Sequence, residues 1–148
     1  MNTSMLAGLF KTPSYRRSER EAMERAAYWL ERVDLHEFAN REANTLAYGQ
    51  QRRLEIARCM VTQPKLLMLD EPANGLTHGE VDELGETIRT IRDEFDLTVL
   101  LVEHHMAMVM EISDAVVVMD FGRKIAEGVP DDVRNDPTVI EAYLGAPA

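Results

Sequence analysis

Two short apolar runs with an amphipathic segment between them constrain the fold of this chain more than any other feature. The first run, Leu66 to Leu69, is apolar at every position and stops at the acidic pair Asp70-Glu71. The second run, Thr98 to Val102, also lacks alternation and stops at Glu103. The segment between them has large apolar residues at helical spacing: Val81, Leu84, Ile88, Ile91 and Phe95. This order predicts two parallel strands with a right-handed helical crossover, and runs without alternation predict strands buried on both faces.

Two helices are predicted ahead of the first strand. Ser18 and Glu21 have the spacing of a capping box, which predicts that the first helix begins at Ser18. Its apolar residues recur at helical spacing: Ala22, Ala26, Trp29, Leu30 and Val33. A polar stretch at residues 40–45 separates it from a second helix that ends before Pro64.

Shorter elements are predicted after the second apolar run. They are a methionine-rich helix at residues 106–112, a strand at 115–119 and, after a turn at 120–123, a returning strand that ends at Gly128. Pro130 and Pro137 are expected to open two closing helices. Together with the parallel pair, these elements predict an α/β protein.

The composition excludes several classes of protein. Hydrophobic residues make up 45% of the 148 residues, which is too apolar for a disordered chain. The net charge of −10 repels phosphate backbones, so we expect no nucleic-acid partner. No apolar run approaches the roughly 20 residues of a transmembrane helix, so we expect no direct membrane span. Cys59 lies in an apolar helical pattern and is expected to be an inert thiol of the core.

The two apolar runs end in groups that suit a phosphate and metal site. Parallel strands bring their carboxyl ends to one edge of a sheet, where ligands bind. Asp70 could hold a magnesium ion there, and Glu71 could orient or deprotonate an attacking water. A polar strand exit without catalytic chemistry explains Asp70-Glu71 equally well.

His104 and His105 directly follow Glu103, and these residue types are also metal ligands. Consecutive residues on an extended chain point in opposite directions, which argues against a shared ion. We therefore expect a structural or phosphate-sensing role for this segment rather than a zinc site.

The segment from Leu46 to Arg58 places Gly49 at the start of the second helix, where free N–H groups can face an anion. A glycine at a helix start is by itself usually only a turn. Followed closely by Leu66 to Pro72, however, this segment resembles the signature motif and the Walker B motif of the ABC (ATP-binding cassette) ATPases. The sequence Leu-Ala-Tyr-Gly-Gln at residues 46–50 is most similar to the ATPase subunits of branched-chain amino acid importers.

The resemblance implies an incomplete P-loop NTPase fold of the ABC type. Residues 1–63 would form a partial helical subdomain, and residues 64–148 the C-terminal part of the parallel-sheet core. Asp70 would serve Mg²⁺, Glu71 would be the catalytic base and His104 would sense the γ-phosphate. The signature residues would contact ATP held by a second ATPase subunit, in a homo- or heterodimer: Leu46, Ala47, Tyr48, Gly49 and Gln50.

Three positions depart from the family pattern. Ala47 replaces a serine and supplies no hydroxyl, Thr77 stands in the D-loop (residues 73–77) where Asp or Asn is expected, and His105 stands where Asp is common. The sequence also contains no G-x-x-x-x-G-K-[ST] loop, with which the family grips phosphates. We therefore expect the C-terminal part of a subunit, with an uncovered apolar sheet face and negligible hydrolysis by itself.

The function implied by the resemblance is ATP binding and hydrolysis in an importer of branched-chain or related amino acids. Integral membrane permease subunits would hold the protein at the inner, cytoplasmic face of the cell membrane. Two alternatives stay open. One is a non-catalytic partner that donates its signature motif in trans, and the other is a nucleic-acid-associated ATPase with the same cassette.

Overall fold

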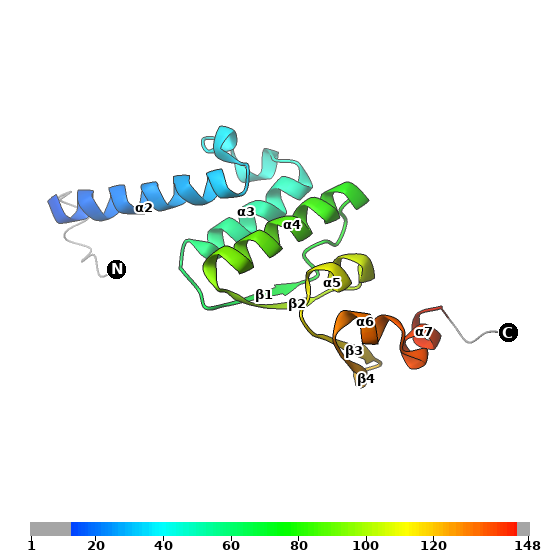
Figure 1. The fold of residues 1–148 in the computed structure, drawn as a ribbon. Coiled ribbons are helices and arrows are strands. Elements are labelled where there is room, and N and C mark those ends of the chain that lie inside the picture. Colours follow the sequence, from blue (N-terminus) through cyan, green and yellow to red (C-terminus); the bar gives the residue numbers. More distant parts are fainter. Residues whose placement is uncertain (1–12, 145–148) are drawn as a thin grey trace. The chain divides into compact units, whose positions relative to one another are not determined.

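The computed structural model of the chain describes residues 13–144. The chain forms two compact units, residues 1–65 and residues 66–148 (Figure 1). The first is helical and the second contains all the strands of the described residues. None of the helices within 13–144 has both the length and the apolar content that crossing a bilayer requires.

The first unit contains two long helices, α2 (Pro13–Arg32) and α3 (Tyr48–Met60), which contact each other. Between them lie two single turns of 3₁₀ helix, η1 (His36–Phe38) and η2 (Ala43–Thr45). The buried apolar residues of this unit follow the predicted helical spacing and continue into the first loop: Trp29, Val33, Leu35, Leu46, Ile56, Ala57 and Met60.

Two expectations for this unit are wrong. The described part of the first helix, α2, runs from Pro13, so Ser18 lies inside the helix rather than at its start. Glu21 is therefore no cap, and its carboxylate instead pairs with Nε of Arg17, one turn earlier, at 3.1 Å. Cys59 is exposed rather than part of the core, because it lies beside the buried stripe of α3 and not within it: Ile56, Ala57 and Met60.

The second unit begins with the predicted strand, helix and strand: β1 (Leu66–Asp70), α4 (His78–Phe95) and β2 (Thr98–Val102). The strands are parallel and pair in register, from Leu66 opposite Thr98 to Asp70 opposite Val102 (Figure 1). The apolar residues of α4 form the predicted buried stripe: Val81, Leu84, Ile88 and Ile91. The prediction of a parallel pair with a helical crossover is confirmed.

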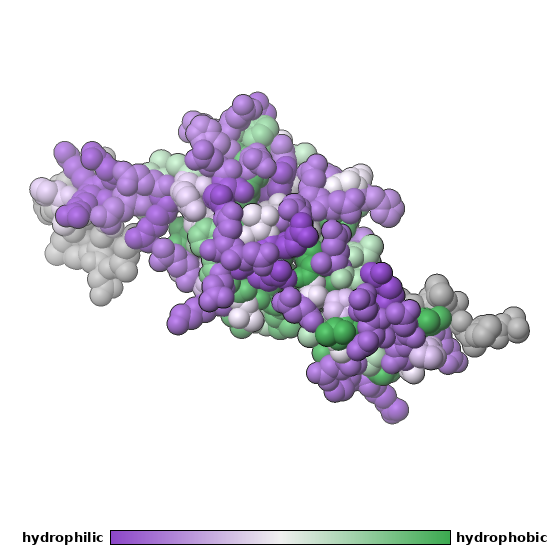
Figure 2. All heavy atoms as spheres, in the orientation of Figure 1, coloured by the Kyte–Doolittle hydropathy of each residue, from purple (hydrophilic) through white to green (hydrophobic). Residues whose placement is uncertain are grey.

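The two strands are not buried on both faces, which corrects the sequence prediction. Leu67 is 4% exposed, but its neighbour Met68 is 67% exposed. Leu66, Leu100 and Val102 are exposed as well and point to the same side as Met68, since side chains alternate along a strand. This uncovered apolar face was expected. In Figure 2, hydrophobic surface is visible in the region of these strands, whereas α2 is covered by hydrophilic residues.

The rest of the second unit follows the predicted order. Helix α5 (Met106–Ile112) leads into an antiparallel hairpin of β3 (Val116–Asp120) and β4 (Arg123–Gly128). Pro130 and Pro137 open the closing helices α6 (Pro130–Arg134) and α7 (Pro137–Leu144), as predicted. A small core joins these elements: Met110, Val116, Val118, Val133 and Val139.

Candidate functional site

The carboxyl ends of β1 and β2 lie side by side and bring Glu71 close to His104. Asp70 is paired with Val102 across the parallel ladder, and the Glu71 N–H donates to the Val102 carbonyl oxygen at 2.8 Å. This bond extends the pairing one residue beyond β1. The residues that directly follow the two strands therefore leave the sheet from neighbouring positions.

Glu71 and His104 face each other at this edge. His104 Nδ1 lies 3.8 Å from Glu71 Oε1, and both side chains keep about half of their surface exposed. Glu71 has a backbone φ of 45°, a left-handed conformation that costs a residue with a side chain about 1 kcal/mol. Strain of this kind is often found at functional sites. Asp70, at the end of β1, is also exposed, so all three groups are open to a ligand from solvent.

Two successive turns follow Glu71. The Asn74 N–H donates to the Glu71 carbonyl oxygen at 3.1 Å, and the Leu76 N–H donates to the Ala73 carbonyl oxygen at 3.1 Å. The second turn needs a positive φ, which Gly75 supplies at 79°. Pro72 and Ala73 are buried, so this loop is packed rather than free.

Thr77 ends the loop as the N-cap of α4. The Glu80 carboxylate accepts the Thr77 N–H at 2.9 Å and the Thr77 hydroxyl at 2.7 Å. The Thr77-x-x-Glu80 spacing is a capping signature that could have been found in the sequence. Thr77, which stands where the family pattern has Asp or Asn, therefore has a structural role as the cap of α4.

Glu103 is the buried centre of the site. Its side chain has no exposed surface. One oxygen accepts the backbone N–H of Ala73 at 2.8 Å, and the other accepts the N–H of His104 at 2.9 Å and of His105 at 3.2 Å. The second oxygen also lies 2.9 Å from Nδ1 of His105. Sequence analysis did not predict these contacts.

The hydrogen bonds to Glu103 determine its charge. Burial favours the neutral acid, but the bonds from the His105 imidazole and from the backbone N–H groups of Ala73, His105 and His104 outweigh it. The pKa of Glu103 is therefore lowered from its usual value, and the group is an anion at neutral pH.

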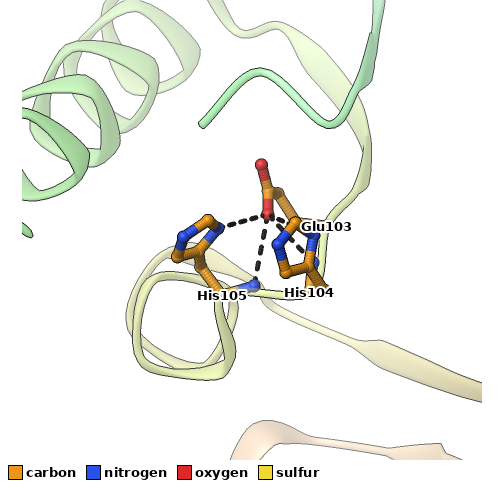
Figure 3. Close-up of side chains that lie close together, drawn as sticks. All are labelled: Glu103, His104 and His105. Carbon is orange, nitrogen blue, oxygen red and sulfur yellow. Dashed lines mark hydrogen bonds and ion pairs between the residues drawn. The ribbon is translucent and has the colours of Figure 1, made fainter. Parts of the chain in front are cut away.

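The side chains of Glu103, His104 and His105 converge, which corrects the argument that consecutive residues here point apart. One ligand atom from each lies within 4.8 Å of the others, and Figure 3 shows both imidazole rings beside the carboxylate. The chain bends at His104, between the end of β2 at Val102 and the start of α5 at Met106, so it is not extended here. The carboxylate oxygens already accept four hydrogen bonds, so an ion would have to displace some of them.

The predicted signature residues lie in the first unit, at the start of α3. Leu46 is buried, Ala47 is the N-cap without a side-chain acceptor, and the Gln50 carboxamide oxygen accepts the Ala47 N–H at 3.0 Å. Tyr48 is 43% exposed, with the Arg52 guanidinium 4.7 Å from its ring centre and hydrogen-bonded to its hydroxyl.

Gly49 occupies the first turn of the same helix. The first hydrogen bond of the helical ladder runs from Gln51 to Ala47 at 3.0 Å, so the N–H groups of the three preceding residues have no place in that ladder. The helix start can therefore offer backbone N–H groups to an anion.

Two known sequence families match this chain. The pattern of the family described as ABC transporter matches residues 3–74. The pattern described as Branched-chain amino acid ATP-binding cassette transporter matches residues 123–148.

Relatives of known name match almost the whole chain. The high-affinity branched-chain amino acid transport ATP-binding protein BraF of Pseudomonas aeruginosa is 63% identical over 145 residues. The corresponding ATP-binding protein LivG of Escherichia coli is 57% identical over 145 residues. Each match covers 98% of this chain and 57% of the relative, so the chain spans somewhat more than half the length of these relatives.

Solved structures of ATP-binding cassettes from ABC transporters resemble the chain. One, in its ADP conformation, matches with a TM-score of 0.78 and 32% identity, over 97% of this chain and 57% of the other. A nucleotide-free cassette matches with a TM-score of 0.76 and 31% identity, over 95% of this chain and 56% of the other.

Proposed function

The chain belongs to the ABC transporter family of ATP-binding proteins, and from this premise we propose that it is part of the ATP-hydrolysing subunit of an importer for branched-chain or related amino acids. The observation that carries the proposal is that Glu71 and His104 face each other at the joined ends of β1 and β2, where Glu71 directly follows Asp70. Hydrolysis of a phosphoanhydride needs a metal ligand, a base and a hydrogen-bond donor to the reacting phosphate. Aspartate, glutamate and histidine can fill these three roles.

Glu71 is the proposed catalytic base. Its half-exposed carboxylate can accept a hydrogen bond from a water molecule and orient it for in-line attack on the γ-phosphate. His104, which follows the carboxyl end of the neighbouring strand β2, is proposed to donate a hydrogen bond to that phosphate. The 3.8 Å between Glu71 Oε1 and His104 Nδ1 keeps both groups within reach of one phosphate.

Asp70 is the proposed ligand of Mg²⁺. Its carboxylate is exposed at the end of β1, and a hard oxygen ligand of this kind fits that ion, which is usually held through one or two carboxylates and water. When bound with the nucleotide, Mg²⁺ neutralises charge on the phosphates. The role of Asp70 is to hold it beside Glu71 without taking part in proton transfer.

The signature residues 46–50 are proposed to act on ATP bound by a second ATPase subunit. Gly49 brings no side chain to the helix start, so an anion can approach the N–H groups of the first turn closely. Buried Leu46 and the bond between Ala47 and Gln50 hold this turn in place. Permease subunits at the inner face of the cell membrane complete the proposed assembly.

The 148 residues contain no G-x-x-x-x-G-K-[ST] run, so we expect the chain by itself not to hydrolyse ATP. It supplies a base and a metal ligand without the loop that holds the substrate's phosphates. Titration of the isolated chain with labelled ATP tests whether it can hold the substrate without that loop. Clear binding at micromolar ATP would contradict the expected loss of ATP binding. The absence of binding would support the proposal that the chain works only within the assembled protein.

The activity itself is tested in a fusion that places this chain behind a segment supplying the family's phosphate-binding loop. Assembled with its permease, the fusion should hydrolyse ATP. Glu71→Gln should abolish turnover and leave nucleotide binding unchanged, because it removes a base and no binding group. Glu111→Gln, at an exposed acid of α5, is the matched control and should keep full turnover. Undiminished turnover by Glu71→Gln would refute the proposed function.

A further inference from the structure

Glu103 is a buried acidic residue for which the proposed hydrolysis has no direct use. Its side chain has no exposed surface, so it cannot reach ATP, water or a metal ion without a rearrangement. It lies directly after β2 and ahead of α5, in the segment that carries His104. A carboxylate buried at this place needs a structural or a functional explanation.

The bonds of Glu103 join two loops that are far apart in the sequence. One oxygen accepts the Ala73 N–H of the loop after β1. The other accepts the N–H groups of His104 and His105 and lies against Nδ1 of His105 (Figure 3). The loop that follows Glu71 and the turn that carries His104 therefore both hydrogen-bond to the carboxylate of Glu103.

An ionised carboxylate is the group that suits these donors. It accepts at both oxygens and donates at neither, so the His105 Nδ1 atom facing it must carry a proton. A glutamine at this place would present an NH₂ group to one of the two sets of donors. In one orientation the amide would lose the bond from Ala73, and in the other it would lose the bonds from His104 and His105.

We propose that Glu103 is a positioning residue that holds Glu71 and His104 at the separation needed for hydrolysis. This inference rests on the proposed function. Glu103 acts through the backbone: it fixes the Ala73 N–H, two residues after Glu71, and the N–H of His104 itself. Because the side chains of Glu71 and His104 are half exposed, packing around them does not set their separation. The bond from the Glu71 N–H to Val102 fixes one side, and the carboxylate of Glu103 holds the loop after Glu71 and the turn of His104 together.

The test uses the assembled fusion protein described above and the variant Glu103→Gln. Turnover should fall by between about tenfold and about a hundredfold, which is the loss expected when reacting groups are misplaced by about 1 Å. The dissociation constant for ATP, measured under conditions that prevent hydrolysis, should stay within about twofold of the original. Glu111→Gln is again the matched control.

A second variant, His105→Phe, keeps the assay informative if Glu103→Gln does not fold. It removes one of the four donors and leaves the carboxylate with the other three. Turnover should fall several-fold with unchanged ATP binding. A loss of turnover that merely parallels a loss of folded protein or of ATP binding in these variants would overturn the positioning role.

A spectroscopic measurement separates this role from general stability. Nitrogen-15 spectra of the histidine rings should show His105 as the Nδ1–H tautomer in the original protein. In Glu103→Ala, which removes the acceptor that faces Nδ1, the population should move toward the Nε2–H tautomer, whereas Glu111→Gln should leave it unchanged. An unchanged His105 tautomer in Glu103→Ala would contradict the proposal.

The two proposals fail in different ways. If Glu71→Gln retains turnover, the proposed function is wrong. If Glu71→Gln abolishes turnover and Glu103→Gln hydrolyses ATP like the original protein, the function stands and the positioning role of Glu103 is wrong.

Discussion

His104 Nδ1 lies 3.8 Å from Glu71 Oε1, yet both side chains keep about half of their surface exposed. Neither is held by a surrounding core. Their separation comes instead from the backbone below them, where Glu71 bonds to Val102 and His104 bonds to Glu103. The site thus combines a fixed framework with reacting groups that remain open to a substrate.

The pKa of Glu103 predicts how the stability of the second unit depends on pH. Because the folded protein lowers this pKa below 4.5, the ionised group stabilises the fold at neutral pH, and that contribution is lost as the pH falls through the lowered value. Glu103→Gln should reduce the free energy of unfolding by about 2 kcal/mol at neutral pH. Urea denaturation at neutral pH and well below pH 4.5 measures the difference, which should shrink in acid. A difference that is independent of pH would contradict the role of the charge.

Two substitutions of Glu71 separate its backbone from its carboxylate. Both Glu71→Gly and Glu71→Ala remove the acid, but only glycine adopts the observed φ of 45° without a steric penalty. We expect the glycine variant to be more stable than the alanine variant by about 1 kcal/mol in urea denaturation. Equal stabilities would show that the backbone at this position is not strained.

Gly85 lies inside α4 against α5, and its replacement tests how closely these helices pack. A Cβ added at Gly85 would lie 3.5 Å from Cγ of Met108 and 3.7 Å from Cγ2 of Ile112, which is ordinary van der Waals contact. Gly85→Ala should therefore stabilise the chain by about 1 kcal/mol through its higher helix propensity. Gly85→Leu is the contrast and should destabilise it, because the longer side chain has no space. Thermal or urea denaturation of both variants shows whether each substitution raises or lowers the stability of the chain.

The uncovered face of β1 and β2 predicts how the 148-residue chain behaves in solution. Met68 and Leu100 are opposite each other on this face and are both at least half exposed. Met68→Thr with Leu100→Thr should raise the monomeric fraction in size-exclusion chromatography, because exposed apolar sheets favour association. The control Leu67→Thr changes a buried neighbour and should destabilise the fold instead. Unchanged association in the double variant would show that this face is not responsible.

The order of helices and strands could be predicted because the signals are local. Apolar spacing within α4, proline at the start of α6 and the two apolar strands each depend on residues close together in the chain. The start of α2 was missed because Ser18 and Glu21 also fit the interior of a helix, where Glu21 pairs with Arg17. A capping pattern indicates a helix start only where the helix does not continue before it.

The meeting of Glu71 and His104 also followed from a general rule, since parallel strands end at the same edge of their sheet. The rule does not predict the contact between Glu103 and Ala73. No periodicity relates this residue to Ala73, and its carboxylate finds that N–H only after both loops have folded.

The amino-acid sequence alone determined the kinds of element in this chain, their order and the family it resembles, because periodicity and short motifs are properties of neighbouring residues. Only the tertiary structure decided which strand faces are covered, as in the contrast between Leu67 and Met68, and which distant groups share a bond. Burial and long-range hydrogen bonds depend on what the rest of the chain places nearby, and that information is not contained in any single segment.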